Sequence, residues 1–256
     1  MLKQLSLVPI CVFVVVAAAL AVLNITEVVA PLLLIPITHT LFISFVSFAV
    51  AYVSARGYMR SGLYSLLLIG NANLAFGLGF LASWLMSAPG GQNVLLTADN
   101  TGTLLSSILN VSAAILSWGG VTESKISQRG RTEVTISYGG VSFFMILLAI
   151  ASFLDITPPF FVQGIGPTPL RDMVLVIALV LFCLSSAGLM KFYFGSKADI
   201  LWWYSLALAL IAVGQLAWLL EKTVGSPLSW TGSIATYLAE TYFLVAVLIP
   251  TRQASR

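Results

Sequence analysis

PLLLIPITHTLFISFVSFAVAYVS, residues 31–54, decides the fold class of this chain. The stretch carries no Asp, Glu, Lys or Arg, contains the single histidine, His39, and is followed by Arg56 and Arg60. A hydrocarbon core about 30 Å thick is crossed by about 20 helical residues. The stretch therefore predicts a membrane-spanning helix with one titratable side chain near its first end.

The whole chain shares this apolar character. Of its 256 residues, 59% are hydrophobic and only 8% are charged, whereas soluble domains carry about 25% charged residues. Because unpaired backbone groups are too costly in lipid, every long apolar run should be a helix. The predicted fold is all-α, a polytopic membrane helix bundle in a single domain over residues 1–256, with eight transmembrane helices at about 5–23, 31–54, 62–87, 102–120, 138–155, 171–194, 199–220 and 230–250.

The charges between these runs predict the orientation. If the N-terminus is cytoplasmic, ten of the 12 Lys and Arg residues fall on the cytoplasmic side, and only Arg171 and Lys222 fall outside. An excess of Lys and Arg marks cytoplasmic loops. Both termini are therefore expected in the cytoplasm, with a polar inner loop at 121–137 and outer loops at 87–100 and 155–169. The first run is longer than the apolar core of a signal peptide, so we expect it to be retained.

Ionisable groups inside a membrane are functional candidates by default. Glu240 lies at the middle of the last run, with Gly232 and Thr236 on the same helix face at four-residue spacing. No Lys or Arg lies centrally in any run, so we expect Glu240 to be a neutral acid hydrogen-bonded between helices. A ligand-contacting or proton-responsive role is the alternative. His39 either bonds a loop carbonyl at the outer interface or contacts a ligand.

Buried amides and small residues complete the polar inventory of the membrane. Ala75, Gly79 and Ser83 form a small-residue ladder that should let another helix approach closely. We hypothesise a cavity towards the outer leaflet between the second, third, fourth and eighth spans. The candidate ligand-binding residues of the chain are His39, Ser44, Asn71, Asn73, Asn110, Thr236 and Glu240.

Other side chains are expected to play structural parts. Trp202, Trp203 and Tyr204 follow Lys197 and should form an interfacial aromatic belt. The two cysteines lie in apolar runs and should be buried free thiols, at Cys11 and Cys183. With one histidine and no Cys-x-x-Cys pair, we expect no metal site.

Several stretches, in order along most of the chain, carry a family resemblance. They are HTLF at 39–42, YSLLLIG at 64–70, NTG at 100–102, GPTPLR at 166–171 and YFLVA at 242–246. Together they resemble the third type of membrane-associated sensor (MASE) domain, which stands at the front of prokaryotic histidine kinases and diguanylate cyclases. The resemblance implies a sensor or ligand-binding module in a prokaryotic cell membrane, which passes a helix shift through the last span. Since the chain ends at IPTRQASR, we expect either part of a longer receptor or a stand-alone relative.

An enzyme is not expected, because the chain has no phosphate loop, no GxSxG or HExxH motif and no nucleophile–base pair on one segment. No cofactor is indicated. The alternative functions are an accessory or structural subunit of a larger membrane complex and, ranked third, a small transporter. The expected partners are the lipid bilayer and either a cytoplasmic signalling domain or other membrane subunits, with no nucleic acid. A homo-oligomer is also compatible with the sequence.

Overall fold

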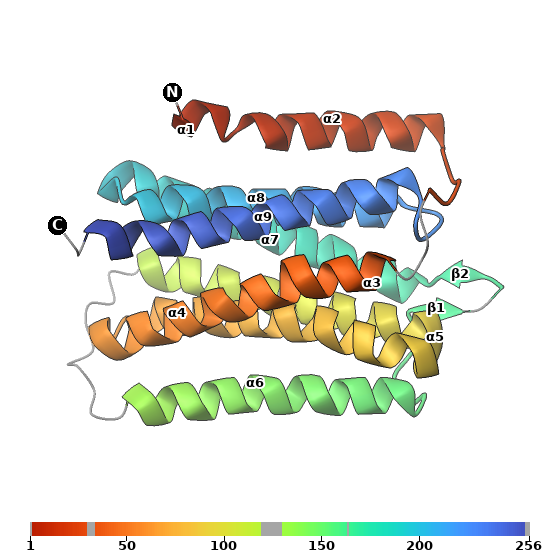
Figure 1. Cartoon of the computed structure of the whole chain (residues 1–256), viewed down its shortest axis with the longest axis horizontal. Helices are drawn as coiled ribbons and strands as arrows, with labels where there is room; N and C mark the ends of the chain where they lie inside the picture. Colours follow the sequence, from red (N-terminus) through yellow and green to blue (C-terminus); the bar gives the residue numbers. More distant parts are fainter. Residues whose placement is uncertain (1, 30–33, 119–129, 163, 254–256) are drawn as a thin grey trace.

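The chain forms a bundle of long, roughly parallel helices (Figure 1). The computed structural model describes residues 2–29, 34–118, 130–162 and 164–253. Within these ranges, 7 helices are long and apolar enough to cross a membrane: Lys3–Leu23, Leu34–Ser61, Tyr64–Leu85, Gly130–Phe153, Pro169–Ser196, Asp199–Leu220 and Pro227–Leu248. The predicted all-α membrane bundle is therefore confirmed.

The elements follow one another with short connections and one small hairpin. They are α1 Leu2–Leu5, α2 Val8–Leu23, α3 Leu34–His39, the π-helical turn η1 Thr40–Ser44, α4 Phe45–Ser61, α5 Tyr64–Trp118, α6 Gly130–Phe153, β1 Phe161–Val162, β2 Gly166–Pro167, α7 Pro169–Ser196, α8 Asp199–Leu220 and α9 Pro227–Gln253. The stretch that decides the fold class is thus α3, η1 and α4 in direct succession. Its π-helical turn begins immediately after His39.

Helix α5 consists of two arms that reverse direction at Gly91 (Figure 1). Gly91 has φ +69° and ψ −169°, a conformation that costs a glycine little because it has no Cβ. The arms pack closely: a Cβ on Gly79 would lie 3.0 Å from the carbonyl oxygen of Ala98 and 3.2 Å from the Cα of Gly102. The small-residue ladder therefore does bring two helices together, as predicted.

The predicted outer loop 87–100 is wrong, because both sides of Gly91 are helical. The predicted inner loop is also too long, since α6 begins at Gly130 rather than at 138. In both places the apolar run marks only part of a helix. The helix continues into polar sequence, where its backbone groups still bond one another.

The cysteine prediction is half wrong. Cys11 and Cys183 are free thiols, but both are exposed on the surface of the bundle rather than buried. In a membrane-spanning helix an apolar run signals lipid contact as readily as a protein core.

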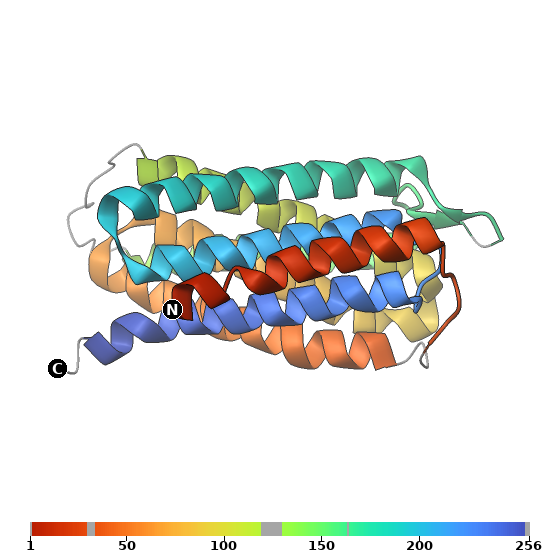
Figure 2. The same ribbon diagram turned by 90° about the horizontal axis from the view of Figure 1, so that it is seen from above.

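The two ends of the bundle differ (Figures 1 and 2). The β1–β2 hairpin and the α8–α9 turn lie at one end, which we call the hairpin end. The break at Gly91 lies there too, since Asn93 bonds the backbone of Phe160 and Phe161 at the hairpin. Helix α1, the α4–α5 turn, the α7–α8 turn and the last turn of α9 lie at the other. Three of the cations used to orient the chain, Lys125, Arg129 and Arg256, lie outside the described residues.

Helix α8 occupies the centre, and 72% of the residues in its 18-residue apolar stretch are buried. By contrast, α2 and α6 lie at opposite edges of the bundle, as Figure 1 shows, and only 11% of the corresponding stretch of each helix is buried. The α6 surface exposes large apolar side chains such as Phe143 and Phe144. Lipid is the natural contact for such a surface, because water would leave this area unfavourably exposed.

Candidate functional site

A buried ion pair joins α7 to the end of α8 at the hairpin end. Arg171 lies in the first turn of α7, which begins after Thr168; the Thr168 side chain accepts a bond from the Arg171 backbone amide. Arg171 Nη2 donates to Glu221 Oε1 at 3.0 Å and to the carbonyl of Trp218 at 3.2 Å. The two charged side chains are 2% and 5% exposed. Such pairs are found where geometry compensates for the loss of hydration.

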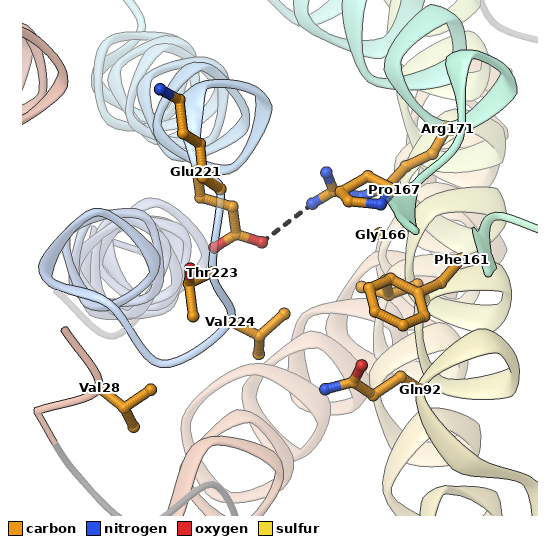
Figure 3. A pocket seen from close by; sticks show the side chains of 11 residues that line it. Val28, Gln92, Phe161, Gly166, Pro167, Arg171, Glu221, Thr223 and Val224 are labelled. Carbon is orange, nitrogen blue, oxygen red and sulfur yellow. Dashed lines mark hydrogen bonds and ion pairs between the residues drawn. The ribbon is translucent and has the colours of Figure 1, made fainter. Parts of the chain in front are cut away.

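The ion pair forms one wall of a cavity of about 260 Å³. Figure 3 shows Arg171 and Glu221 pointing toward one another, with Gln92, Phe161 and Val224 around the adjacent space. The β1–β2 hairpin is fixed over the cavity because Asn93 Oδ1 accepts from the backbone amides of Phe160 and Phe161, at 2.8 and 3.2 Å. The cavity is lined by Val28, Gln92, Leu96, Phe161, Gly166, Pro167, Arg171, Glu221, Lys222, Thr223 and Val224.

A smaller recess of about 40 Å³ adjoins this cavity and runs deeper into the bundle. It shares the ion pair with the cavity and adds His39, Asp99 and Asn100 to the lining. Its volume suits one or two waters or one small chemical group. The two spaces together place charged, amide and imidazole side chains around one hollow at the hairpin end.

Several buried polar atoms of this hollow have no hydrogen-bond partner among the described residues. They are Arg171 Nε and Nη1, Glu221 Oε2, Asp99 Oδ1 and Asn100 Nδ2. Arg171 Nη1 has only a loose ionic contact, 3.8 Å from the exposed carboxylate of Asp172. Since buried polar groups in proteins are nearly always satisfied, the site has capacity to bind both donors and acceptors.

Glu221 follows the last residue of α8 and lies outside the apolar span. Burial raises the pKa of Glu221 from 4.5 to about 7, while the nearby guanidinium of Arg171 and the hydroxyl of Ser229 oppose this rise. Burial has the larger effect because a charged carboxylate loses its hydration there. Glu221 therefore changes protonation close to neutral pH.

His39 is 5% exposed and contacts one serine and three aromatic rings. Its Nε2 lies 2.9 Å from Ser233 Oγ on α9. The Ser233 hydroxyl also lies 3.0 Å from the carbonyl of Ser229, so a proton on Nε2 would allow both contacts to be hydrogen bonds. Rings of Phe80, Trp218 and Tyr237 lie 5.0 to 5.9 Å from the imidazole centroid. These contacts fix the ring in one orientation.

Glu240 lies fully buried in α9, away from the hollow. Ser47 Oγ donates to Glu240 Oε1 at 2.9 Å, and Oε2 has no partner among the described residues. None of the ion pairs found in the described part of the chain includes Glu240. The inward-facing stripe is confirmed, since Thr236 is also fully buried. Its hydroxyl, however, bonds the carbonyl of Gly232 within α9.

A second polar network lies deeper in the bundle, between both arms of α5 and α8. Asn73 Nδ2 donates to the hydroxyl of Tyr204 at 3.1 Å, and that hydroxyl donates to Asn110 Oδ1 at 2.7 Å. Tyr204 is 3% exposed, so its assignment to an interfacial belt is wrong. A tyrosine near a helix end follows its hydrogen-bond partners, and here both are amides of the bundle interior.

The predicted binding residues are therefore dispersed. His39 lines the recess, whereas the other six line neither of the two spaces described. Asn71 donates to Ser137 on α6 at 3.2 Å, and Ser44 is buried without a partner among the described residues. Most of these groups hold helices to one another.

Sequence reasoning missed Arg171, Glu221 and Asp99. A signal was present for the first two. Arg171 opens one span and Glu221 closes the next, so consecutive antiparallel helices must bring them to the same end. Asp99 had no such signal, because the outer segment containing it was taken for a loop.

No protein-family model, no curated protein and no solved structure matches the chain. In the described residues there is also no group of three or more His, Cys, Asp and Glu side chains able to hold a metal ion. The geometry thus defines the class of protein only broadly. It is a helical membrane protein with a charged hollow at one end.

Proposed function

We propose that the protein is an integral membrane sensor module, which binds a small ligand at the hairpin end and signals its presence to a cytoplasmic partner. The observation that supports this best is the buried Arg171–Glu221 pair beside a cavity of about 260 Å³. A charged pair that only joined helices would not need a hollow next to it. Ligand sites, by contrast, typically combine apolar walls with a few convergent polar groups.

The proposed topology has eight spans, with both termini in the cytoplasm of a prokaryotic cell. The break at Gly91 divides α5 into two arms that each run the length of the bundle, which supplies the eighth span (Figure 1). Arg171 and Lys222 belong to the hairpin end, while Arg56 and Arg60 belong to the last turns of α4 at the other end. The positive-inside rule then places the hairpin end outside.

Helix α9 is the proposed path for the signal. Ser229 lines the recess and Ser233 bonds His39, so a ligand there contacts the first turns of α9 directly. The same helix continues to the opposite end of the bundle (Figure 1). The π-helical turn after His39 is a second element of interest, because such turns are rare and frequently occur at functional sites.

Two other functions remain as alternatives. Amide and hydroxyl networks such as Asn73–Tyr204–Asn110 would also suit an accessory subunit of a membrane complex, whose polar groups join helices. A small transporter would have to open the same hollow to both sides. We assign no catalytic activity and no cofactor, and the proposed partners are lipid, a cytoplasmic signalling domain or other membrane subunits.

Distance measurements between spin labels test the sensor proposal. Cys11 and Cys183 are first replaced by alanine, and labels are placed at Arg60 and Leu248, near the cytoplasmic ends of α4 and α9. A panel of small acids, amines, amino acids and sugars is screened for thermal stabilisation of the protein in nanodiscs. A compound that binds should change the label distance in the parent and not in a cavity-filled variant, Val224→Phe.

The alternatives give different results. Binding without any change of the distance would contradict the sensor proposal. Uptake of the bound compound into proteoliposomes would favour the transporter. If no compound in the panel stabilises the protein and copurifying membrane subunits do, the accessory role is favoured instead.

A further inference from the structure

We propose that the hollow at the hairpin end binds a small zwitterion, an α-amino acid with an apolar side chain. In this arrangement Arg171 holds the carboxylate of the ligand and Asp99 holds its ammonium group. The inference rests on the proposed binding function and names the ligand class of the same site.

The carboxylate position follows from the guanidinium of Arg171. One of its nitrogens, Nη2, is used by Glu221 and Trp218, which leaves Nε and Nη1 without a hydrogen-bond partner among the described residues. The residue is 2% exposed, so bulk water does not satisfy these donors. Each of these two N–H groups is free to donate a charge-assisted hydrogen bond to a carboxylate oxygen of the ligand.

The ammonium position follows from the two acids that line the hollow, Asp99 and Glu221. Asp99 on α5 is 8% exposed and Glu221 is 8% exposed, and each has one carboxylate oxygen without a partner in the described chain. Glu221 is already engaged with Arg171, whereas Asp99 has no cation in contact among the described ion pairs. Asp99 and Arg171 line the same recess. Asp99 is therefore the acid available to a ligand cation.

The unpartnered atoms favour a zwitterion over either charge alone. An anion would leave the free carboxyl oxygens of Glu221 and Asp99 without a donor, and a cation would leave Nε and Nη1 of Arg171 without an acceptor. In a buried site such unsatisfied polar atoms are costly. A ligand with both charges places each one against its opposite and leaves the net charge of the hollow unchanged.

The walls set the size and polarity of the remaining part of the ligand. Leu96, Phe161 and Val224 contribute apolar surface to the cavity of about 260 Å³. Sites for drug-sized molecules measure about 300–1,000 Å³, so the occupant is smaller than these. An aliphatic amino acid meets both requirements.

Three matched probes test the ligand class by calorimetry on the full chain in nanodiscs. L-leucine carries both charges, 4-methylpentanoate lacks the ammonium group, and 3-methylbutylamine lacks the carboxylate. L-leucine should bind about tenfold or more tightly than either analogue, because a site built for a polar group rejects ligands without it. If either analogue binds as tightly as leucine, or if none of the three binds, the inference is overturned.

Variants separate this role from a structural one. Asp99→Asn should weaken leucine binding about tenfold while leaving the binding of 4-methylpentanoate within about twofold. Val224→Phe fills the cavity and should abolish binding, whereas Val176→Phe adds the same bulk on an exposed face of α7 and should not. Equal losses for leucine and 4-methylpentanoate in Asp99→Asn would contradict the assigned role of Asp99.

The ligand class and the sensor function fail separately. If the leucine set does not bind but another compound moves the labels on α4 and α9, the zwitterion inference falls and the sensor proposal stands. If leucine binds as expected without moving the labels, the ligand class stands and the sensor proposal falls.

Discussion

At the scale of single residues, the Arg171–Glu221 pair couples the hairpin end to pH. Glu221 has a pKa of about 7 in the folded protein, raised by burial from 4.5. The folded state therefore binds more protons than the unfolded state between these values. A raised pKa stabilises the fold below 4.5, and this contribution is lost as the pH rises through 7.

We predict that the free energy of unfolding of the parent, minus that of Glu221→Gln, falls as the pH is raised from 5 to 8. The size of the loss should be on the order of 3 kcal/mol, because one pKa unit corresponds to about 1.4 kcal/mol. Thermal unfolding in detergent at a series of pH values measures it. Asp172→Asn is the matched control, since that carboxylate touches the same guanidinium at 3.8 Å but its side chain is 52% exposed. A difference that grows with pH would show that Glu221 is stabilised in its ionised form.

Glu240 makes a second prediction at this scale. The buried side chain accepts from Ser47 and has no cation in contact among the described ion pairs, so we expect the neutral acid at pH 7. Glu240→Gln keeps an acceptor for Ser47 and should fold nearly as well as the parent. Glu240→Ala strands that hydroxyl and should cost about 1–3 kcal/mol in the free energy of unfolding.

Thermal unfolding in detergent at pH 7 compares the two Glu240 variants. Ser47→Ala serves as the control, because it removes the donor and should reduce the difference between Gln and Ala at position 240. If Gln is as damaging as Ala, Glu240 is ionised and paired, and the neutral-acid hypothesis is wrong.

At the scale of elements, the two arms of α5 depend on glycine at their contact. A Cβ on Gly102 would lie 2.9 Å from both the carbonyl oxygen of Ala75 and the Cα of Gly79. Because these are backbone atoms, the helices themselves would have to separate. We predict that Gly102→Ala lowers the free energy of unfolding by about 1–3 kcal/mol, as overpacking commonly does.

Gly139→Ala is the matched control for the α5 contact. A Cβ there meets nothing within 4 Å, so alanine should be neutral or should stabilise α6 by up to about 1 kcal/mol through its higher helix propensity. Chemical or thermal unfolding in the same detergent measures both variants. Equal effects of the two substitutions would refute close packing of the arms.

The sequence predicts the existence of the helices better than it predicts their ends or their polar contacts. Apolar length is dictated by the thickness of lipid, so the spans could be recognised from composition alone. The ends could not, because residues 87–100 read as a loop but are helical around a single glycine, Gly91. Side-chain partners depend on which helices become neighbours. Tyr204 therefore turned inward to two amides that no local pattern connects to it.

The candidate site shows the same division. His39 and Glu240 were recognisable because ionisable groups are rare inside a membrane. The hollow itself arises only when Arg171 of α7, Asp99 of α5 and Glu221, directly after α8, meet. No spacing along the chain encodes that meeting, although the shared end of α7 and α8 could have suggested its first two members.

At the scale of the whole molecule, the proposed topology places every described cation of the α4–α5 and α7–α8 turns on one side of the membrane. We predict that a cysteine at Ser196, which is exposed at the end of α7, is protected from an impermeant thiol reagent added outside intact cells. A cysteine at Ile165 in the β1–β2 hairpin, where the side chain is 83% exposed, should react. The background for both is a chain in which Cys11 and Cys183 are replaced by alanine, because both native thiols are exposed. Cell lysis should make Ser196→Cys reactive, which shows that the residue is accessible once the barrier is removed. Labelling of Ser196→Cys in intact cells, or protection of Ile165→Cys, would contradict the proposed orientation. The ligand hollow would then lie at the cytoplasmic face.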